Sequence, residues 1–154
     1  MYLRGMERRW HFLLERSLTP AEEAALSESL HAALQGWRSH GRPIAFRIAF
    51  PYHHFIEVIA QGPISGCATD TLWRLVRETV HRQGLRLLPT EWVAIQDEGN
   101  IFLKNFSEIK KIYLTGAWPS SWRVIEAQEG GLRCVSLRES ALAAPLRLLC
   151  ESPS

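Results

Sequence analysis

Covalent chemistry is suggested at one place in this chain, the turn that contains Cys67. A hydrophobic segment ends at Gln61-Gly-Pro63, and Cys67 and then Asp70 follow at the start of an amphipathic segment. A thiol in the first turn of a helix faces unpaired backbone N–H groups and the positive end of the helix dipole, which together favour the thiolate. A histidine elsewhere in the chain, His40 or one of His53 and His54, would supply a base. These residues predict a candidate nucleophilic or redox-responsive thiol.

The same turn also has a purely structural interpretation. Ser65 or Cys67 would cap the helix, Asp70 would stabilise its first turn, and the thiol would be buried and inert. The negative charge of Asp70 would also oppose formation of a thiolate. We favour this interpretation, so Cys67, Asp70 and His40 are candidates and no catalytic residue is assigned.

The histidines also have a structural interpretation in place of a catalytic one. His40 is expected in the last turn of the first helix, where a histidine interacts favourably with the negative end of the helix dipole and can bond the last carbonyls. His53 and His54 are neighbours in an expected turn, and their alternating directions disfavour joint ligation of a metal. Because no third ligand stands at a recognisable spacing, we predict neither a metal site nor a cofactor.

Periodicity and turn residues predict a regular order of elements. They indicate, in chain order, a strand at 10–14, a helix that starts at the Thr19–Glu22 capping box and ends near Gly41, strands at 45–50 and 55–60, a helix from about 66 to Gly84, strands at 91–96 and 101–103, and a short helix at 105–113. The leading strand, helix, strand, strand, helix, strand order is typical of the ferredoxin-like split βαβ fold, in which the helices cover one face of an antiparallel sheet. We therefore predict an α+β protein with this βαββαβ arrangement.

The length of 154 residues predicts a single domain over 1–154. We expect its core at about 10–115 and a short C-terminal extension at 116–154. In that extension, 122–127 and 132–137 are expected to pair as a hairpin, and 141–150 is either a docked helix or an irregular tail.

Composition excludes several classes of protein. The apolar fraction of 46%, the charged fraction of 22% and the net charge of +2 are those of an ordinary globular protein and do not favour nucleic acid. No apolar run approaches the roughly 18 residues that span a bilayer, and the N-terminus is too charged for a signal peptide. Three widely spaced cysteines form neither a disulfide framework nor a zinc pattern. We expect a cytoplasmic protein.

Two further sets of residues are candidates for binding a partner. Arg74 and Arg77 belong to a basic stripe on the second helix, but no aromatic RNA-binding signature accompanies it, so a solvated helix face is favoured over an RNA site. Trp118 and Trp122 flank a loop-like segment, where large aromatic side chains would anchor a partner.

Three motifs give the chain a family resemblance: Trp37-Arg-Ser-His-Gly-Arg-Pro-Ile44, Tyr52-His-His-Phe-Ile-Glu-Val-Ile-Ala60 and Ser65-Gly-Cys-Ala-Thr-Asp70. They resemble a small bacterial family, typical of Bacteroidota, whose members carry W-x-x-H-G-x-P-L, Y-x-x-F-L-V-L and S-G-C-S-I-D. The similarity covers roughly residues 10 to 115. This chain departs from the family at Gln61-Gly-Pro63, where members carry acidic residues.

The resemblance implies an order of elements rather than an activity, because the family has no established function. Some members carry an ABC-transporter ATPase label, but this sequence contains no G-x-x-x-x-G-K-[ST] phosphate loop. We predict a binding or assembly module without catalytic activity, homodimeric or bound to another protein through its sheet or the Trp118–Trp122 segment. The alternatives are a cysteine-dependent enzyme or redox-responsive protein that uses Cys67, and an RNA-binding protein.

Overall fold

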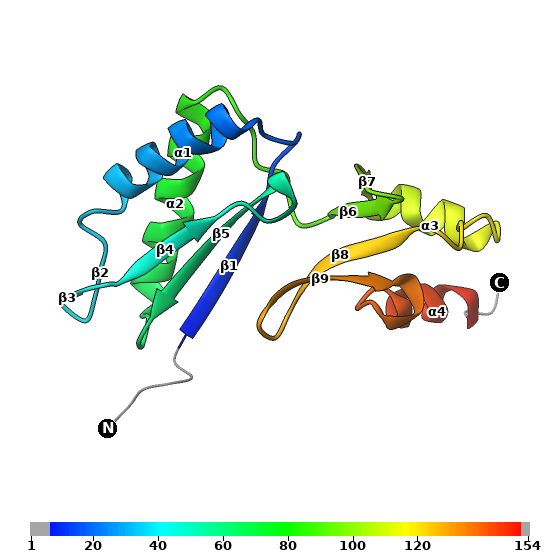
Figure 1. The fold of residues 1–154 in the computed structure, drawn as a ribbon. Helices are drawn as coiled ribbons and strands as arrows, with labels where there is room; N and C mark the ends of the chain where they lie inside the picture. Colours follow the sequence, from blue (N-terminus) through cyan, green and yellow to red (C-terminus); the bar gives the residue numbers. More distant parts are fainter. Residues whose placement is uncertain (1–6, 152–154) are drawn as a thin grey trace. The chain divides into compact units, whose positions relative to one another are not determined.

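The structure is a computed structural model that describes residues 7–151, with side chains described as far as Arg147. The chain divides into two compact units, with the boundary between Leu88 and Pro89 (Figure 1). This division lies upstream of residue 115, where the sequence pattern predicted the end of the core. The single domain expected from the chain length stays a prediction. Each unit has its own hydrophobic cluster and is described by itself.

The first unit contains a three-stranded sheet, a short hairpin and two long helices. Its elements are β1 (Glu7–Leu13), α1 (Pro20–Ala33), β2 (Arg38–Ser39), β3 (Arg42–Pro43), β4 (Phe46–Ala49), the 3-10 turn η1 (Pro51–His53), β5 (Phe55–Gln61) and α2 (Gly66–Arg82). The sheet is antiparallel with the order β1-β5-β4, so β5 is central and β1 is at an edge.

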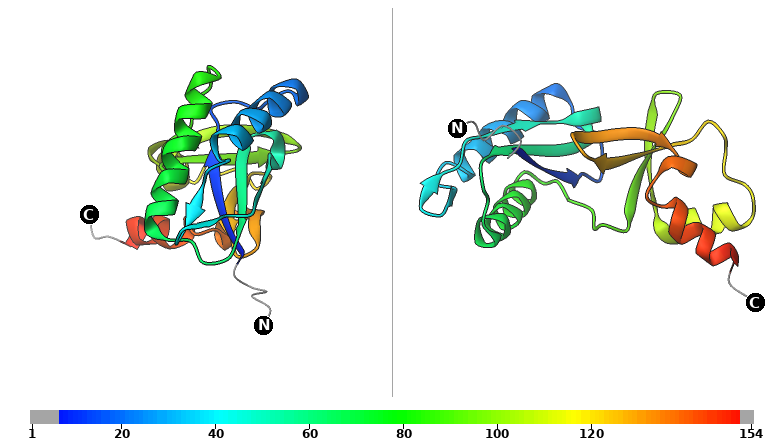
Figure 2. Two further views of the ribbon diagram at one scale, coloured as in Figure 1. Left: turned by 90° about the vertical axis from the view of Figure 1, so that its left-hand side faces the viewer. Right: turned by 90° about the horizontal axis from the view of Figure 1, so that it is seen from below.

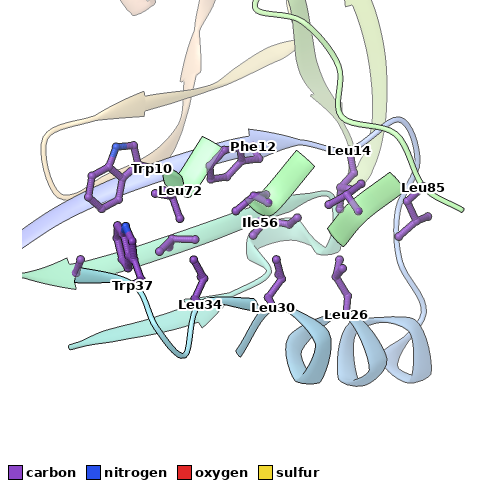
Figure 3. Close-up of a cluster of buried hydrophobic side chains, with 14 of the residues drawn as sticks. Trp10, Phe12, Leu14, Leu26, Leu30, Leu34, Trp37, Ile56, Leu72 and Leu85 are labelled. Carbon is purple, nitrogen blue, oxygen red and sulfur yellow. The ribbon is translucent and has the colours of Figure 1, made fainter. Parts of the chain in front are cut away.

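Both helices of the first unit pack against the same face of this sheet (Figures 1 and 2). Alternate residues of β1 and β5 point toward the helices, which explains the strand periodicity. Leu26 and Leu30 of α1 and Leu34, the residue that caps its end, form a row that faces Phe12 and the other buried side chains of the cluster (Figure 3). Burial of this apolar stripe, more than helix propensity, stabilises α1.

The start of α1 was predicted correctly, but its end was not. Thr19 and Glu22 form the expected capping box. However, the helix ends at Ala33, and Trp37 lies beyond it as a buried residue of the following loop. His40 and Gly41, with φ of 52° and 75°, form the two-residue turn between β2 and β3. Two consecutive positive φ values suit such a hairpin turn, so Gly41 is not a helix terminator.

The coarse fold class is confirmed, whereas the predicted ferredoxin-like order is not shown. Within residues 7–151 the protein is α+β, with four α-helices and three antiparallel sheets. The expected fourth strand forms as β6 (Trp92–Asp97), but it pairs in the sheet of the second unit. Among residues 7–151, a single bridge, Leu14 to Leu87, continues the first sheet beyond β1.

The second unit contains a four-stranded antiparallel sheet of order β7-β6-β8-β9. Its elements are β6, β7 (Asn100–Asn105), α3 (Phe106–Leu114), β8 (Arg123–Gln128), β9 (Gly131–Ser136), the 3-10 turn η2 (Leu137–Glu139) and α4 (Ala143–Glu151). The capping box of Asn105 with Glu108 and the β8–β9 hairpin are both confirmed. The last segment is a helix rather than an irregular tail.

Candidate functional site

The turn before α2 is held by the β2–β3 hairpin. The indole Nε1 of Trp37 donates to the backbone O of Ala68 at 2.8 Å. Ser39 Oγ donates to the O of Pro63 at 3.0 Å and accepts from the N of Ser65 at 2.9 Å. Ser65 Oγ in turn accepts from the N of Ala68 and caps the helix. The structure therefore brings together two of the motifs that the sequence analysis singled out.

Cys67 is the second residue of α2, and its side chain is exposed. The expectation that this thiol is buried is wrong, and Ser65 rather than Cys67 is the cap. Capping by Ser65 engages the N–H of Ala68, one of the first unpaired donors of the helix. No hydrogen bond from another described residue reaches the thiol. The position leaves Cys67 accessible to solvent but gives it no base.

Asp70 lies too far along α2 to stabilise its first turn. It is the fifth residue of the helix and is exposed, and the first turn contains no acidic residue. The predicted capping or dipole role of Asp70 is therefore wrong, because such effects fall off within one turn. Within the described part of the chain, Asp70 forms neither a hydrogen bond nor an ion pair.

His40 occupies the tip of the β2–β3 hairpin and is exposed. It does not lie in the last turn of α1, so the predicted interaction with the end of that helix is wrong. No hydrogen bond joins His40 to Cys67 among residues 7–151. The three sequence candidates thus do not form a nucleophile–base pair as described for catalytic thiols.

The neighbouring histidines lie in two different environments. His53 is exposed and its Nδ1 lies 2.5 Å from a carboxylate oxygen of Glu23 in α1. His54 is only 5% exposed, and neither of its ring nitrogens has a hydrogen-bond partner. Burial lowers the pKa of His54 below its ordinary value, because desolvation penalises the charged ring. In the described residues, no group of three or more His, Cys, Asp or Glu side chains is placed to hold a metal ion.

The predicted binding residues lie on two separate units. Arg74 and Arg77 are exposed on α2, and Arg74 pairs with Glu78 at 3.7 Å, as on a solvated helix face. Trp118 and Trp122 are half-buried and pack edge to face at 5.2 Å within the second hydrophobic cluster. The tryptophan pair therefore already has a packing role inside its own unit.

Sequence reasoning missed a charged network on the sheet of the first unit. The register of β1 and β5 places His11 opposite Glu57, and the two side chains lie 2.7 Å apart. Both are only 10% exposed. Arg9 approaches the same carboxylate at 3.3 Å and also pairs with Glu7 at 2.7 Å. An acidic residue within an otherwise apolar strand was the available signal, since a buried carboxylate requires a partner.

Binding through the sheet was predicted from the sequence, and the structure adds which backbone groups of β1 face its outer edge. Leu14 donates its N–H to the O of His54 on the β5 side at 3.0 Å. Because backbone groups of successive residues alternate in an antiparallel ladder, those of Arg9 and His11 point away from β5. The segment that follows α2 pairs with this edge at the C-terminal end of β1, where the N–H of Leu88 donates to the O of Leu13 at 2.8 Å.

The helices of residues 7–151 lack the combination of length and hydropathy that a membrane crossing requires. No protein-family model, curated protein or solved structure matches this chain.

Proposed function

We propose that this protein is a binding module that takes up an extended strand along the outer edge of β1. One observation carries the proposal: within residues 7–88, β1 is the terminal strand of an antiparallel sheet in which the next position is occupied only at the Leu14–Leu87 bridge. Exposed sheet edges pair readily with another chain, and several families of binding domain use this mode.

The proposed strand would complete a split βαβ fold. The first unit supplies β1, α1, β4, β5 and α2 in that order, with β5 between β1 and β4. A strand beside β1 would give the four-stranded order of a ferredoxin-like sheet. The chain begins such a strand at Arg86, Leu87 and Leu88 but then passes into the second unit at Pro89.

The edge is suited to act as a template because its strand is held in place. Arg9 and His11 pair through their side chains with Glu57 of β5, while their backbone groups point outward. The added strand would therefore be bound through main-chain hydrogen bonds, which supply the affinity in this mode of binding. The hydrogen bonds between β1 and β5 would stay intact.

The proposal is tested with two substitutions at one position. Arg9→Ala removes the side chain but retains the outward N–H, whereas Arg9→Pro removes both. Peptides selected from a random displayed library against the wild-type protein are then measured for binding to each variant. We expect binding to survive Arg9→Ala and to weaken about tenfold or more in Arg9→Pro, because a main-chain donor is lost.

Both variants must first melt cooperatively and give the wild-type circular dichroism spectrum. If the Arg9→Pro variant is unfolded, hydrogen exchange of the wild-type amides of Arg9 and His11 decides the question. Slower exchange of these two amides on peptide binding supports strand uptake. Equal binding to both folded variants, or unchanged exchange at the edge, contradicts it.

A second candidate function is favoured by the exposure of Cys67 in the first turn of α2. A thiol in this position is a candidate for reversible oxidation or nucleophilic chemistry. The test is the rate of alkylation of the folded protein as a function of pH, with Cys134 and Cys150 replaced by serine. Faster reaction near neutral pH than for the urea-unfolded chain supports this function, and an equal or slower rate excludes an activated thiol.

A further inference from the structure

We infer that the corner between β4 and β5 is a pH-sensitive hinge that opens on acidification and releases the connection between β1 and α1. The corner comprises residues 50–54, and the group that triggers its opening is the buried ring of His54. The inference follows from the surroundings of that ring, from the backbone conformation of the corner, and from the hydrogen bonds by which the corner holds residues 14–18. It does not depend on strand uptake at β1.

The ring of His54 lies inside the first unit. The register of β1 and β5 ends with Leu13 opposite Phe55, and Leu14 N donates to His54 O at 3.0 Å, so His54 lies opposite Leu14. Residues directly opposite each other in an antiparallel pair point to the same side of the sheet. Leu14 belongs to the hydrophobic cluster on the side that α1 and α2 cover (Figure 3). His54 therefore points to this covered side, which accounts for its exposure of only 5%.

A protonated ring is not compatible with this position. Protonated histidine has two N–H donors and a positive charge, which are costly to bury without partners. In the described part of the chain, neither ring nitrogen of His54 has a hydrogen-bond partner. Burial accordingly lowers the pKa of His54 below its ordinary value. The charged ring is therefore stable only in a state in which it reaches solvent.

The charged groups of the neighbouring loops and of the start of α1 do not bond to the ring. They are Glu15 and Arg16 before α1, Glu22 and Glu23 in its first turn, Arg86 after α2, and Tyr52 and His53 of the corner itself. The two acids of α1 already pair with Arg16 and with His53. The ring of Tyr52 packs against that of Phe55, and the remaining groups are exposed. A protonated His54 therefore has no counter-charge in its buried position.

The sheet and α2 supply no counter-charge either. His11 of β1 and Glu57 of β5 pair with each other on the opposite face of the sheet, because side chains alternate along a strand. At the end of α2 nearest the corner, His81 and Arg82 are exposed and basic. A positive charge on His54 is thus unfavourable with respect to every element that packs around it.

The corner has a backbone conformation that favours rearrangement. Tyr52 and His53 have φ of 57° and 56°, although neither residue is glycine. Left-handed backbone is costly for such residues and persists only where surrounding contacts impose it. The pairing of β4 with β5 begins beyond the corner, at Ala49 and Glu57. The corner can therefore move and lose this strain while the sheet stays paired.

Movement of the corner releases the connection between β1 and α1. His53 O accepts from Leu18 N at 2.7 Å, and His54 O accepts from Leu14 N at 3.0 Å. These two bonds tie the connection to the corner at both of its ends. Leu18 is only 6% exposed, so its release uncovers apolar surface. The hinge would thus present at acidic pH a surface that the protein conceals at neutral pH.

The neighbouring His53 acts in the opposite direction. Its Nδ1 lies 2.5 Å from a carboxylate oxygen of Glu23, and protonation strengthens this pair and holds the corner against α1. The side chain of His53 is exposed, so the effect of this pair is small. The response of the corner to pH therefore follows the buried ring of His54.

Hydrogen exchange of the full-length protein measures the opening. Protection factors, corrected for the intrinsic effect of pH on exchange, are compared at pH 7 and pH 5 for the amides of Leu14 and Leu18. Because the open state binds a proton at the ordinary pKa of 6.5, these factors should fall by about 10-fold to 25-fold. The amide of Ile44, which donates to Trp37 O far from the corner in sequence, should keep its protection.

Three substitutions identify the trigger. His54→Leu should abolish the fall, because leucine cannot be charged. His53→Asn removes the other histidine of the corner, tolerates positive φ, and should keep the fall or enlarge it slightly. His40→Leu at the exposed hairpin tip is the matched control and should leave the fall unchanged. If His54→Leu does not fold, the wild-type ring is titrated by NMR, and its midpoint should coincide with that of the fall in protection.

Four outcomes contradict the hinge. Unchanged protection of Leu14 and Leu18 at pH 5 shows that the corner stays closed. An equal loss at Ile44 shows global unfolding rather than a local opening. A fall that survives His54→Leu but not His53→Asn assigns the pH dependence to the exposed histidine. A ring of His54 that titrates at a pH at which both amides keep their protection separates its protonation from the opening.

Discussion

Trp37 and Ala68, which are far apart in the sequence, are joined by a hydrogen bond of 2.8 Å from the indole Nε1 to the backbone O. Trp37 is only 3% exposed, and its ring also packs edge to face with Trp10 and Phe46. The indole therefore anchors the loop after α1 to the first turn of α2. This contact explains why a large aromatic residue lies between the helix and the hairpin.

We predict that Trp37→Phe destabilises the protein by about 1–3 kcal/mol. The substitution retains a ring in the cluster but removes the donor and leaves a small void. Chemical denaturation measures the effect. The control is Trp73→Phe, which should change the free energy of unfolding by less than about 0.5 kcal/mol because Trp73 is 38% exposed and a ring is retained. Equal effects of the two substitutions would contradict an anchoring role for Trp37.

At the start of α2, we predict that Ser65 contributes to stability and Asp70 does not. Ser65→Ala should lower the free energy of unfolding by about 0.5–2 kcal/mol, because it removes the oxygen that accepts from the N–H of Ala68. Asp70→Ala should change it by less than about 0.5 kcal/mol, since Asp70 lies beyond the first turn. Thermal melts of both variants measure this difference. A larger loss for Asp70→Ala would restore the capping role expected from the sequence.

For the charged network on the sheet, we predict strong coupling between His11 and Glu57. Each single substitution to alanine leaves a nearly buried partner without its closest polar contact. A double-mutant cycle should therefore give a coupling energy of about 1–3 kcal/mol. The corresponding cycle for Arg74 and Glu78, which form an exposed pair, should give less than about 0.5 kcal/mol. Comparable coupling energies in the two cycles would show that the buried network adds no special stability.

For His54, we predict a specific pH dependence of stability. Its pKa in the folded protein is below the ordinary value of 6.5, because the ring is buried without hydrogen-bond partners. The unfolded chain therefore binds a proton at this histidine more readily than the folded protein does. The contribution of neutral His54 to the free energy of unfolding is thus fully present above pH 6.5 and is lost as the pH falls below that value. At neutral pH, the His54→Leu variant should be at least as stable as the wild type. On acidification, the free energy of unfolding should fall further for the wild type than for the variant.

The matched control for this measurement is His40→Leu at the exposed hairpin tip. It should retain the pH dependence of the wild type, since the substitution leaves His54 in place. If the His54→Leu variant loses stability with falling pH as steeply as the wild type, His54 is not the group responsible.

Helix starts and turns that depend on residues close in the sequence could be predicted. Thr19 with Glu22 and Asn105 with Glu108 form the two capping boxes that their spacing indicates. The hairpin in the C-terminal extension also forms where the Gly-Gly turn indicates it. The sequence likewise located Cys67 in the first turn of α2. These features are local, because each is satisfied by hydrogen bonds or backbone angles within a few residues.

Other features were decided only by contacts between distant residues. Trp37 lies beyond the end of α1 and bonds to Ala68 of a distant helix, and the pairing of His11 with Glu57 depends on the register of two strands. β6 forms as predicted but pairs in the second unit, which leaves β1 at the edge of the first sheet. The sequence alone determined where most helices and strands begin, because periodicity and capping act locally. The tertiary structure decided which strands meet, because pairing depends on long-range packing that no local pattern encodes.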